Sequence, residues 1–262
     1  MKRRLMLTLA AATTLFLSTS VSAAEVLKVG ASPVPHADIL KVVQPELSKK
    51  GIDLKIIEFS DYVQPNLALN DGDLDANYFQ HKPYLQSFSA DHRLKLTDIG
   101  NVHIEPMAVY SHKVKDIKDL KKGAKIGIPN DPTNGGRALK VLENAGILKL
   151  KDGVGITATP MDIVENPKNV RIVEIEAAVL PRSLEDLDAS VINSNFALGA
   201  GLNPTKDALA IEAKDSPYAN VVAAREVDKD KPALKALMKE LQSEKVKKFI
   251  EEKYQGAVIP AF

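Results

Sequence analysis

The sequence has 262 residues and a formal net charge of +1 at pH 7, because 35 lysines and arginines nearly balance 34 acidic residues. This balance gives no excess of positive charge of the kind that binds nucleic acid. Hydrophobic residues make up 45% and charged residues 26% of the chain, which is typical of a folded protein and excludes a disordered one. Since cysteine is absent, disulfides, thiolate nucleophiles and cysteine-based metal centres are excluded as well.

The first 24 residues have the three parts of a secretory signal peptide. Residues 2–4 are basic, an apolar run covers residues 5–17, and small residues follow at 21–24. The apolar run is too short to cross the roughly 30 Å of hydrocarbon in a membrane. We expect cleavage near Ala24, which removes three positive charges and leaves an exported, mildly acidic chain.

Short strand patterns alternate with helical patterns along the rest of the chain. Strands are predicted at residues 26–31, 54–59, 74–78, 102–110, 125–129, 170–175, 189–192 and 221–224. Helices are predicted at residues 37–49 and 136–144 and over the long amphipathic run 232–254. The alternation predicts an α/β protein with largely parallel sheets, in which ligands bind in loops at the carboxyl ends of strands.

A polar loop follows the strand predicted at 125–129 and leads into a helix. Arg137 lies in the first turns of that helix, where free backbone N–H groups already attract an anion. A guanidinium at this place adds a two-pronged grip on a carboxylate. A solvated arginine on an ordinary capped helix is the alternative, but a cation has the wrong sign for this end of the helix dipole. A bound anion would therefore account for Arg137.

Aromatic and amide side chains gather near the ends of three other predicted strands. Phe79, His81 and Tyr84 suit a ligand with an apolar side chain, or equally the packing of a core. Asn193 follows a strand and Asn220 opens one. Amides both donate and accept hydrogen bonds, so the two could hold both ends of a zwitterion, although each is also an ordinary turn residue. The residues alone leave both interpretations open.

Metal and catalytic motifs are poorly represented. The five histidines, at positions 36, 81, 92, 103 and 112, have no spacing typical of a metal motif, although a site could still assemble in space. A P-loop and a Gly-x-Ser-x-Gly motif are both absent. An exported enzyme would need a nucleophile beside a base, and His81 is the only cleft candidate for that base. We therefore expect no cofactor, no resident metal and no catalysis.

Longer motifs give the chain a family resemblance over nearly the whole predicted mature sequence. They are Gly30-Ala31-Ser32-Pro33-Val34-Pro35-His36, Phe79-Gln80-His81-Lys82-Pro83-Tyr84-Leu85, Ile128-Pro129-Asn130-Asp131-Pro132-Thr133-Asn134, Glu165-Asn166-Pro167-Lys168-Asn169, Leu180-Pro181-Arg182-Ser183-Leu184 and Ser216-Pro217-Tyr218. In this order they resemble the NlpA lipoprotein family of methionine-binding proteins. The resemblance implies a two-lobed, type II-like periplasmic binding protein, a monomer that delivers methionine to an ABC permease.

The same resemblance implies roles for residues at matching positions. Arg137 would bind the α-carboxylate, and Asn193 and Asn220 would hold the amino-acid head group. From the other lobe the resemblance implies contacts by His81, Tyr84, Tyr62 and Phe79, the last two lining the side-chain pocket, with Asn195 as a further candidate. Gly135 and Gly136 depart from the family pattern just before Arg137, where many members have a bulkier residue.

Domain bounds, location and alternatives complete these expectations. Lobe 1 would comprise residues 25–108 plus 222–262 and lobe 2 residues 109–221, with crossings near 107–110 and 219–223 and a ligand-driven hinge closure between them. Many family members carry a lipid on an N-terminal cysteine; since this sequence has none, we expect a periplasmic protein without a lipid anchor. The alternatives are another apolar amino acid or a methionine-containing dipeptide as the ligand, a metal-binding transport protein, and an exported enzyme.

Overall fold

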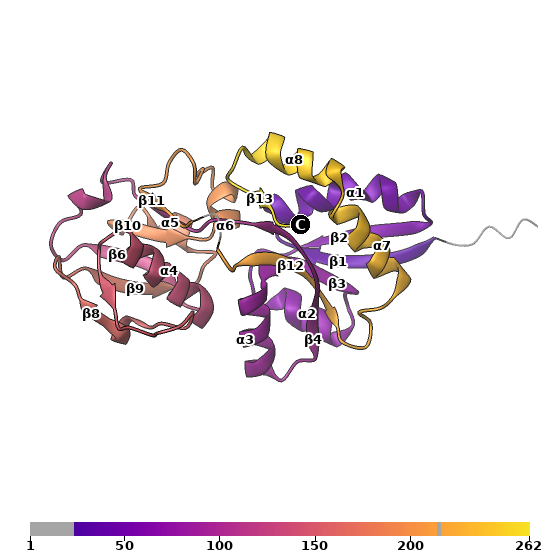
Figure 1. Cartoon of the computed structure of the whole chain (residues 1–262), viewed down its shortest axis with the longest axis horizontal. Coiled ribbons are helices and arrows are strands. Elements are labelled where there is room, and N and C mark those ends of the chain that lie inside the picture. Colours follow the sequence, from indigo (N-terminus) through magenta and orange to yellow (C-terminus); the bar gives the residue numbers. More distant parts are fainter. Residues whose placement is uncertain (1–23, 214–215) are drawn as a thin grey trace, which may run out of the picture.

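The computed structural model describes residues 24–213 and 216–262, and the predicted signal peptide lies outside these ranges except for its last residue. Two lobes lie side by side, each built on its own β-sheet (Figure 1). Within the described ranges, no helix has the length and apolar character needed to span a membrane. The two-lobed α/β architecture expected from the sequence is therefore confirmed.

The first lobe contains a six-stranded sheet in the order β13-β4-β12-β3-β1-β2. Its strands are β1 (Glu25–Ala31), β2 (Ile52–Glu58), β3 (Ala76–His81), β4 (Leu96–Ile104), β12 (Ala219–Arg225) and β13 (Ile259–Pro260). One face is covered by α1 (Asp38–Ser48), α7 (Pro232–Leu241) and α8 (Glu244–Tyr254), and the other by α2 (Gln64–Asp71) and α3 (Lys82–His92). Both faces are apolar because each packs against helices.

The second lobe contains a five-stranded sheet in the order β11-β5-β10-β6-β9. Its strands are β5 (Ala108–Tyr110), β6 (Lys125–Pro129), β9 (Arg171–Ile175), β10 (Ala189–Ile192) and β11 (Ala210–Ile211). Helix α4 (Pro132–Asn144) packs on one face, and α5 (Leu180–Ser183) and α6 (Ser194–Gly199) on the other. Smaller elements are the ribbon of β7 (Lys149–Leu150) and β8 (Ile163–Glu165), and the short helices η1 (Pro33–Ala37), η2 (Ile117–Asp119) and η3 (Pro160–Asp162).

Two segments connect the lobes, and both join neighbouring strands of the first sheet. The chain leaves β4 through residues 105–107 to reach β5, and it returns from β11 to β12. Strand β12 pairs antiparallel with β4, and the register shifts between Asn220 and Val221 and again between Val222 and Ala223. Ala108 lies in a strand of the second sheet and residues 219–221 lie in a strand of the first, which differs by one and three residues from the predicted lobe bounds. The lobe bounds stay a prediction.

Two expectations about elements are wrong. The sheets are mixed: β1 pairs parallel with β2 and β3, whereas β12 pairs antiparallel with β3 and β4, and β13 pairs antiparallel with β4. The helical run predicted at 232–254 is two helices, and Ser243 caps the second by accepting a hydrogen bond from the backbone N–H of Val246. A serine at such a position competes with helix continuation and starts a new helix instead.

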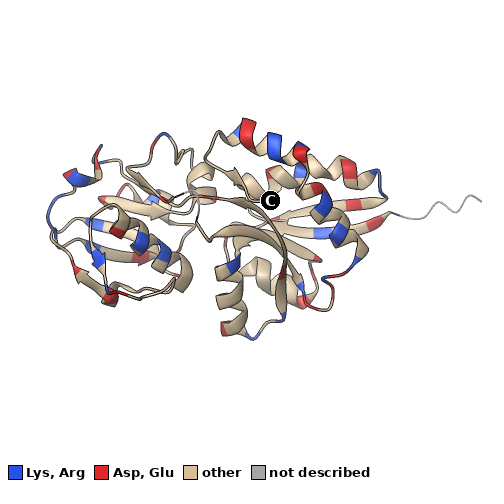
Figure 2. Cartoon of the chain, viewed as in Figure 1, with Lys and Arg blue, Asp and Glu red and all other residues tan. Residues whose placement is uncertain are grey.

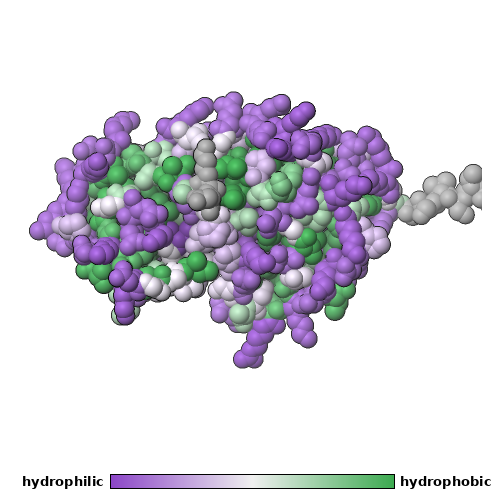
Figure 3. All heavy atoms as spheres, viewed as in Figure 1, coloured by the Kyte–Doolittle hydropathy of each residue, from purple (hydrophilic) through white to green (hydrophobic). Residues whose placement is uncertain are grey.

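Charged side chains lie mainly on the outside of the molecule. Figure 2 shows both acidic and basic residues on the outer helices α7 and α8. Figure 3 shows hydrophilic side chains over much of one face, with smaller apolar areas between them. Large exposed apolar residues include Met161 and Val227, and exposed apolar side chains are common on the surfaces of folded proteins. The charges that bear on function are the few buried between the lobes.

Candidate ligand-binding site between the lobes

A cavity between the lobes is lined by side chains from both of them. Its empty volume is about 330 Å³, which includes space open to solvent. All eight residues predicted from the sequence line it: Tyr62, Phe79, His81, Tyr84, Arg137, Asn193, Asn195 and Asn220. Four lining residues were missed: Gln80, Glu105, Asn134 and Ser194.

His81 is held in one tautomer by the start of a helix. Strand β3 ends at His81 and α3 begins directly after it, so the imidazole caps the helix and its Nδ1 accepts from the backbone N–H of Tyr84 at 3.1 Å. The proton must therefore be on Nε2, which donates to Asn134 Oδ1 at 3.0 Å. Burial, helped by the positive charge of Arg137, lowers the pKa of His81 to about 3. The ring is neutral, and neither nitrogen is left to activate a nucleophile.

Asn134 connects the two lobes through one oxygen. Asp131 caps α4 by accepting from the Asn134 backbone N–H at 2.9 Å, and it also accepts from the Asn134 side-chain amide at 3.0 Å. This fixes the orientation of the amide, whose Oδ1 accepts from His81 of the first lobe and from Asn193 Nδ2 at 2.8 Å. The aspartate three residues before Asn134 is the capping signal that could have identified this residue from the sequence.

Arg137 is buried and already holds a carboxylate. Its Nε and Nη2 donate to the two oxygens of Glu212, at 2.9 and 2.5 Å, and Nη2 also donates to the Glu105 carbonyl at 2.8 Å. Only 3% of the side chain is exposed, and the guanidinium lies 4.2 Å from the centre of the Tyr218 ring. The two-pronged grip expected for an anion is thus present, but in this structure Glu212 occupies it.

An aromatic wall closes another side of the cavity. The Tyr62 ring centre lies 5.9 Å from that of Phe79, 5.8 Å from that of Tyr84 and 4.9 Å from that of Phe196 in the second lobe. The Tyr62 hydroxyl donates to Asn195 Oδ1 at 2.5 Å, a further bond between the lobes. Phe79 and Tyr84 are buried in a small apolar cluster and also line the cavity, so both interpretations of these rings apply.

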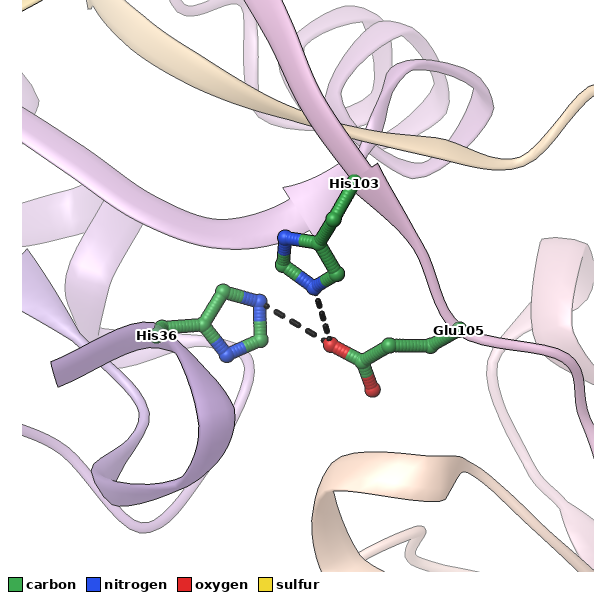
Figure 4. A group of neighbouring side chains, drawn as sticks. All are labelled: His36, His103 and Glu105. Carbon is green, nitrogen blue, oxygen red and sulfur yellow. Dashed lines mark hydrogen bonds and ion pairs between the residues drawn. The ribbon is translucent and has the colours of Figure 1, made fainter. Parts of the chain in front are cut away.

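The cavity reaches a buried polar cluster of His36, His103 and Glu105 (Figure 4). Glu105 Oε1 lies 2.7 Å from His103 Nε2 and 3.3 Å from His36 Nε2. Burial lowers the pKa of His36 to about 4 and that of His103 to about 3, and it raises the pKa of Glu105. Their ligand atoms all lie within 4.8 Å of one another, so the cluster could hold a metal ion that no sequence motif predicted.

Comparison with known proteins decides the classification. The family model described as NlpA lipoprotein matches residues 27–262. The chain belongs to the NlpA lipoprotein family. The chain is similar to the D-methionine-binding lipoprotein MetQ of Salmonella typhimurium. The two are 44% identical over 236 residues, which cover 89% of this chain and 87% of the relative. MetQ of Escherichia coli is 43% identical over the same shares.

Solved structures agree with this membership. A nutrient binding protein from Burkholderia cenocepacia bound to methionine is 50% identical, with a TM-score of 0.87 over 90% of this chain and all of that one. A lipoprotein from Ruminococcus gnavus is 45% identical, with a TM-score of 0.89 over 91% of this chain and all of that one. NlpA family members are substrate-binding proteins, and the family is not one of enzymes.

One expectation from the sequence is contradicted by these relatives. We expected a periplasmic protein without a lipid anchor, whereas the NlpA family and its MetQ members are named lipoproteins, and a further relative is an outer membrane lipoprotein of Mannheimia haemolytica. The expectation of an unanchored protein is therefore wrong. It rested on the absence of cysteine from this sequence, whereas the relatives that match most of the chain carry the name lipoprotein.

Proposed function

We propose that this chain binds methionine between its lobes and delivers it to a membrane ABC permease. The observation that carries the proposal is the composition of the cavity, which combines a buried guanidinium, a buried carboxylate and an aromatic wall. A zwitterion with an apolar side chain needs these three chemistries, one for each of its parts. The methionine-bound relative from Burkholderia cenocepacia supports the choice of methionine among such ligands.

The eight predicted site residues take their roles from this proposal. Arg137 would bind the ligand carboxylate and share its guanidinium with Glu212, while Asn193 and Asn220 would orient the head group. Tyr62, Phe79 and Tyr84 would surround the side chain, with His81 and Asn195 completing the two sides of the cavity.

Closure of the lobes would couple binding to delivery. The bonds from His81 to Asn134 and from Tyr62 to Asn195 join side chains of opposite lobes, so they exist only while the lobes are together. A ligand that contacts both lobes adds its own contacts to the closed state and shifts the equilibrium toward it by that difference. The monomeric closed form would then present both lobes to the permease.

Native mass spectrometry followed by calorimetry tests the proposal. We expect the protein as purified to carry a mass that matches methionine. After unfolding, dialysis and refolding, it should bind L- or D-methionine more tightly than leucine and than the dipeptide glycylmethionine. Tighter binding of leucine or of the dipeptide would move the assignment to those ligands, and no binding of any of them would refute the proposal.

A further inference from the structure

The inference concerns the buried cluster of His36, His103 and Glu105 and goes beyond the proposed function. His36 lies in η1, His103 is the penultimate residue of β4, and Glu105 follows that strand in the segment that leads to the second lobe. Their side chains are only 1%, 0% and 6% exposed. Groups that can carry charge are rarely buried this completely unless they are paired or bind a metal, because removing a charge from water is unfavourable.

The nitrogen and oxygen atoms of the cluster lie close enough together to share one ion. Glu105 Oε1 lies 2.7 Å from His103 Nε2 and 3.3 Å from His36 Nε2, and Figure 4 shows both rings turning a nitrogen toward this oxygen. Asn220 Oδ1 is a further acceptor, 3.0 Å from His36 Nε2. Four ligands about 2.0–2.1 Å from a tetrahedral ion are roughly 3.3 Å apart. The separations in the cluster are at or somewhat below this value, so a small outward movement of the side chains makes room for an ion.

Hydrogen bonds alone satisfy this cluster incompletely. Nε2 of His36 has two acceptors beside it, Asn220 Oδ1 and Glu105 Oε1, but it carries at most one proton. Arg137 pairs with Glu212 and contacts Glu105 only at the backbone carbonyl. Within the described ranges, no lysine or arginine forms an ion pair with the Glu105 carboxylate. A metal ion supplies what is missing, namely a positive charge beside the carboxylate and a common centre for the lone pairs.

Tyr78 holds one of the imidazoles from outside the cluster. Its hydroxyl is hydrogen-bonded to His103 Nδ1, and histidines that bind a metal through one nitrogen commonly hold the other in such a bond. A hydroxyl both donates and accepts, so it also suits the tautomer with the proton on Nδ1, which leaves Nε2 free to bind an ion. The buried Tyr78 ring packs edge-on against both imidazoles, with centroids 4.7 Å from that of His36 and 5.4 Å from that of His103. Tyr78 therefore keeps both rings in place.

We propose that His36, His103 and Glu105 bind a divalent transition-metal ion such as Zn²⁺, with Asn220 Oδ1 as a fourth ligand. Two imidazoles and a carboxylate are a donor set of zinc and of other first-row ions, whereas Ca²⁺ and Mg²⁺ prefer oxygen ligands alone. The cavity is the path by which the ion enters, since Glu105 and Asn220 line its wall. His103 and Asn220 pair with each other across β4 and β12, so the ion ties together the strands that carry the two connections between the lobes.

Calorimetry with Zn²⁺ alone tests the site, on protein freed of bound ligand by unfolding, dialysis against a chelator and refolding. We expect the wild type to bind one equivalent with a dissociation constant of about 10 μM or below. Glu105→Gln and His103→Gln each remove one ligand and should weaken binding at least about 100-fold, because loss of a ligand's hydrogen-bond partner alone costs about 10–100-fold. His112→Gln is the matched control and should bind Zn²⁺ as tightly as the wild type, because His112 also lies 3.2 Å from a glutamate, Glu185, but is 47% exposed.

X-ray absorption spectroscopy of the zinc-loaded wild type identifies the ligands directly, so a variant that fails to fold does not affect this arm. Two imidazoles and at least one oxygen at about 2.0–2.2 Å from the ion would support the site. Absence of stoichiometric binding by the wild type, fewer than two imidazoles in the spectrum, or equal affinity in His103→Gln and His112→Gln would each refute the inference. None of these measurements uses methionine, so the proposed function is tested separately.

Discussion

Replacing Arg137 by alanine should lower stability and ligand affinity for two different reasons. The guanidinium makes two hydrogen bonds to Glu212 and one to the Glu105 carbonyl, and the Glu212 side chain is only 10% exposed. Without the guanidinium, the largely buried carboxylate of Glu212 has no cationic partner, which lowers the free energy of unfolding by about 3–5 kcal/mol. Loss of the guanidinium also removes the proposed partner of the ligand carboxylate, so affinity should fall by about 2–5 kcal/mol, or roughly 30-fold to several-thousand-fold.

The double variant Arg137→Ala/Glu212→Ala separates the two effects. Because no stranded carboxylate remains, urea unfolding should show that part of the lost stability returns. Calorimetry should show methionine affinity as low as in the single variant, because the cation is still missing. Arg182→Ala removes an exposed arginine and should change neither quantity. Wild-type affinity in Arg137→Ala, or affinity that recovers together with stability in the double variant, would refute the assignment of Arg137 to the ligand.

Three further outcomes are expected. In Tyr62→Phe the interlobe bond to Asn195 is lost, and calorimetry should show affinity about fivefold weaker, from roughly 1 kcal/mol; unchanged affinity would mean that this bond does not favour closure. A Cβ at Gly136 would lie 2.3 Å from the backbone carbonyl oxygen of Ile156, so Gly136→Ala should lower the free energy of unfolding by about 1–3 kcal/mol. Gly155 has open space around it, so Gly155→Ala should leave the free energy of unfolding unchanged. Equal effects of the two substitutions in urea unfolding would contradict the clash. The pKa of His81 is lowered from 6.5 to about 3, so below pH 6.5 the unfolded chain binds a proton that the folded chain does not, and the free energy of unfolding falls by about 1.4 kcal/mol per pH unit. His81→Gln should therefore make the free energy of unfolding less pH-dependent between pH 7 and 5. An unaltered pH dependence would show that His81 titrates normally in the fold.

Elements with purely local signals were predictable from the sequence. The strands β6 and β10 have the predicted bounds, because each is a short apolar run between polar turns. The break at Ser243 also had a local signal, since a serine inside a helical pattern is a capping residue. The antiparallel pairing of β4 with β12 had none, because it depends on a chain that returns after visiting the other lobe.

The residues of the candidate site also fall into two groups, those with a local sequence signal and those placed by contacts between distant segments. His81 caps the start of α3 and Arg137 lies in the second turn of α4, so both could be placed from local sequence, and both line the cavity. Glu105 and Glu212 carry no motif. Glu105 contacts His103, two residues before it, but also His36, 69 residues before it, and Glu212 contacts Arg137, 75 residues before it. Gly136 was recognised as unusual, but only the close approach of the loop at 156 explains why a side chain is excluded there. Long-range contacts of this kind are set by the tertiary fold and are not encoded in local spacing.

The pairing of the two connecting strands has a mechanical consequence. Since β4 and β12 are bonded neighbours, the two connections leave the first sheet side by side, and we expect them to bend together in the proposed closure. Asn220 pairs with His103 on this ribbon, one residue before a shift in register, and Glu105 follows directly. An amino acid bound as proposed would lie beside these connecting strands, where a small rotation would displace the outer surfaces of the lobes by an amount that grows with their distance from the strands.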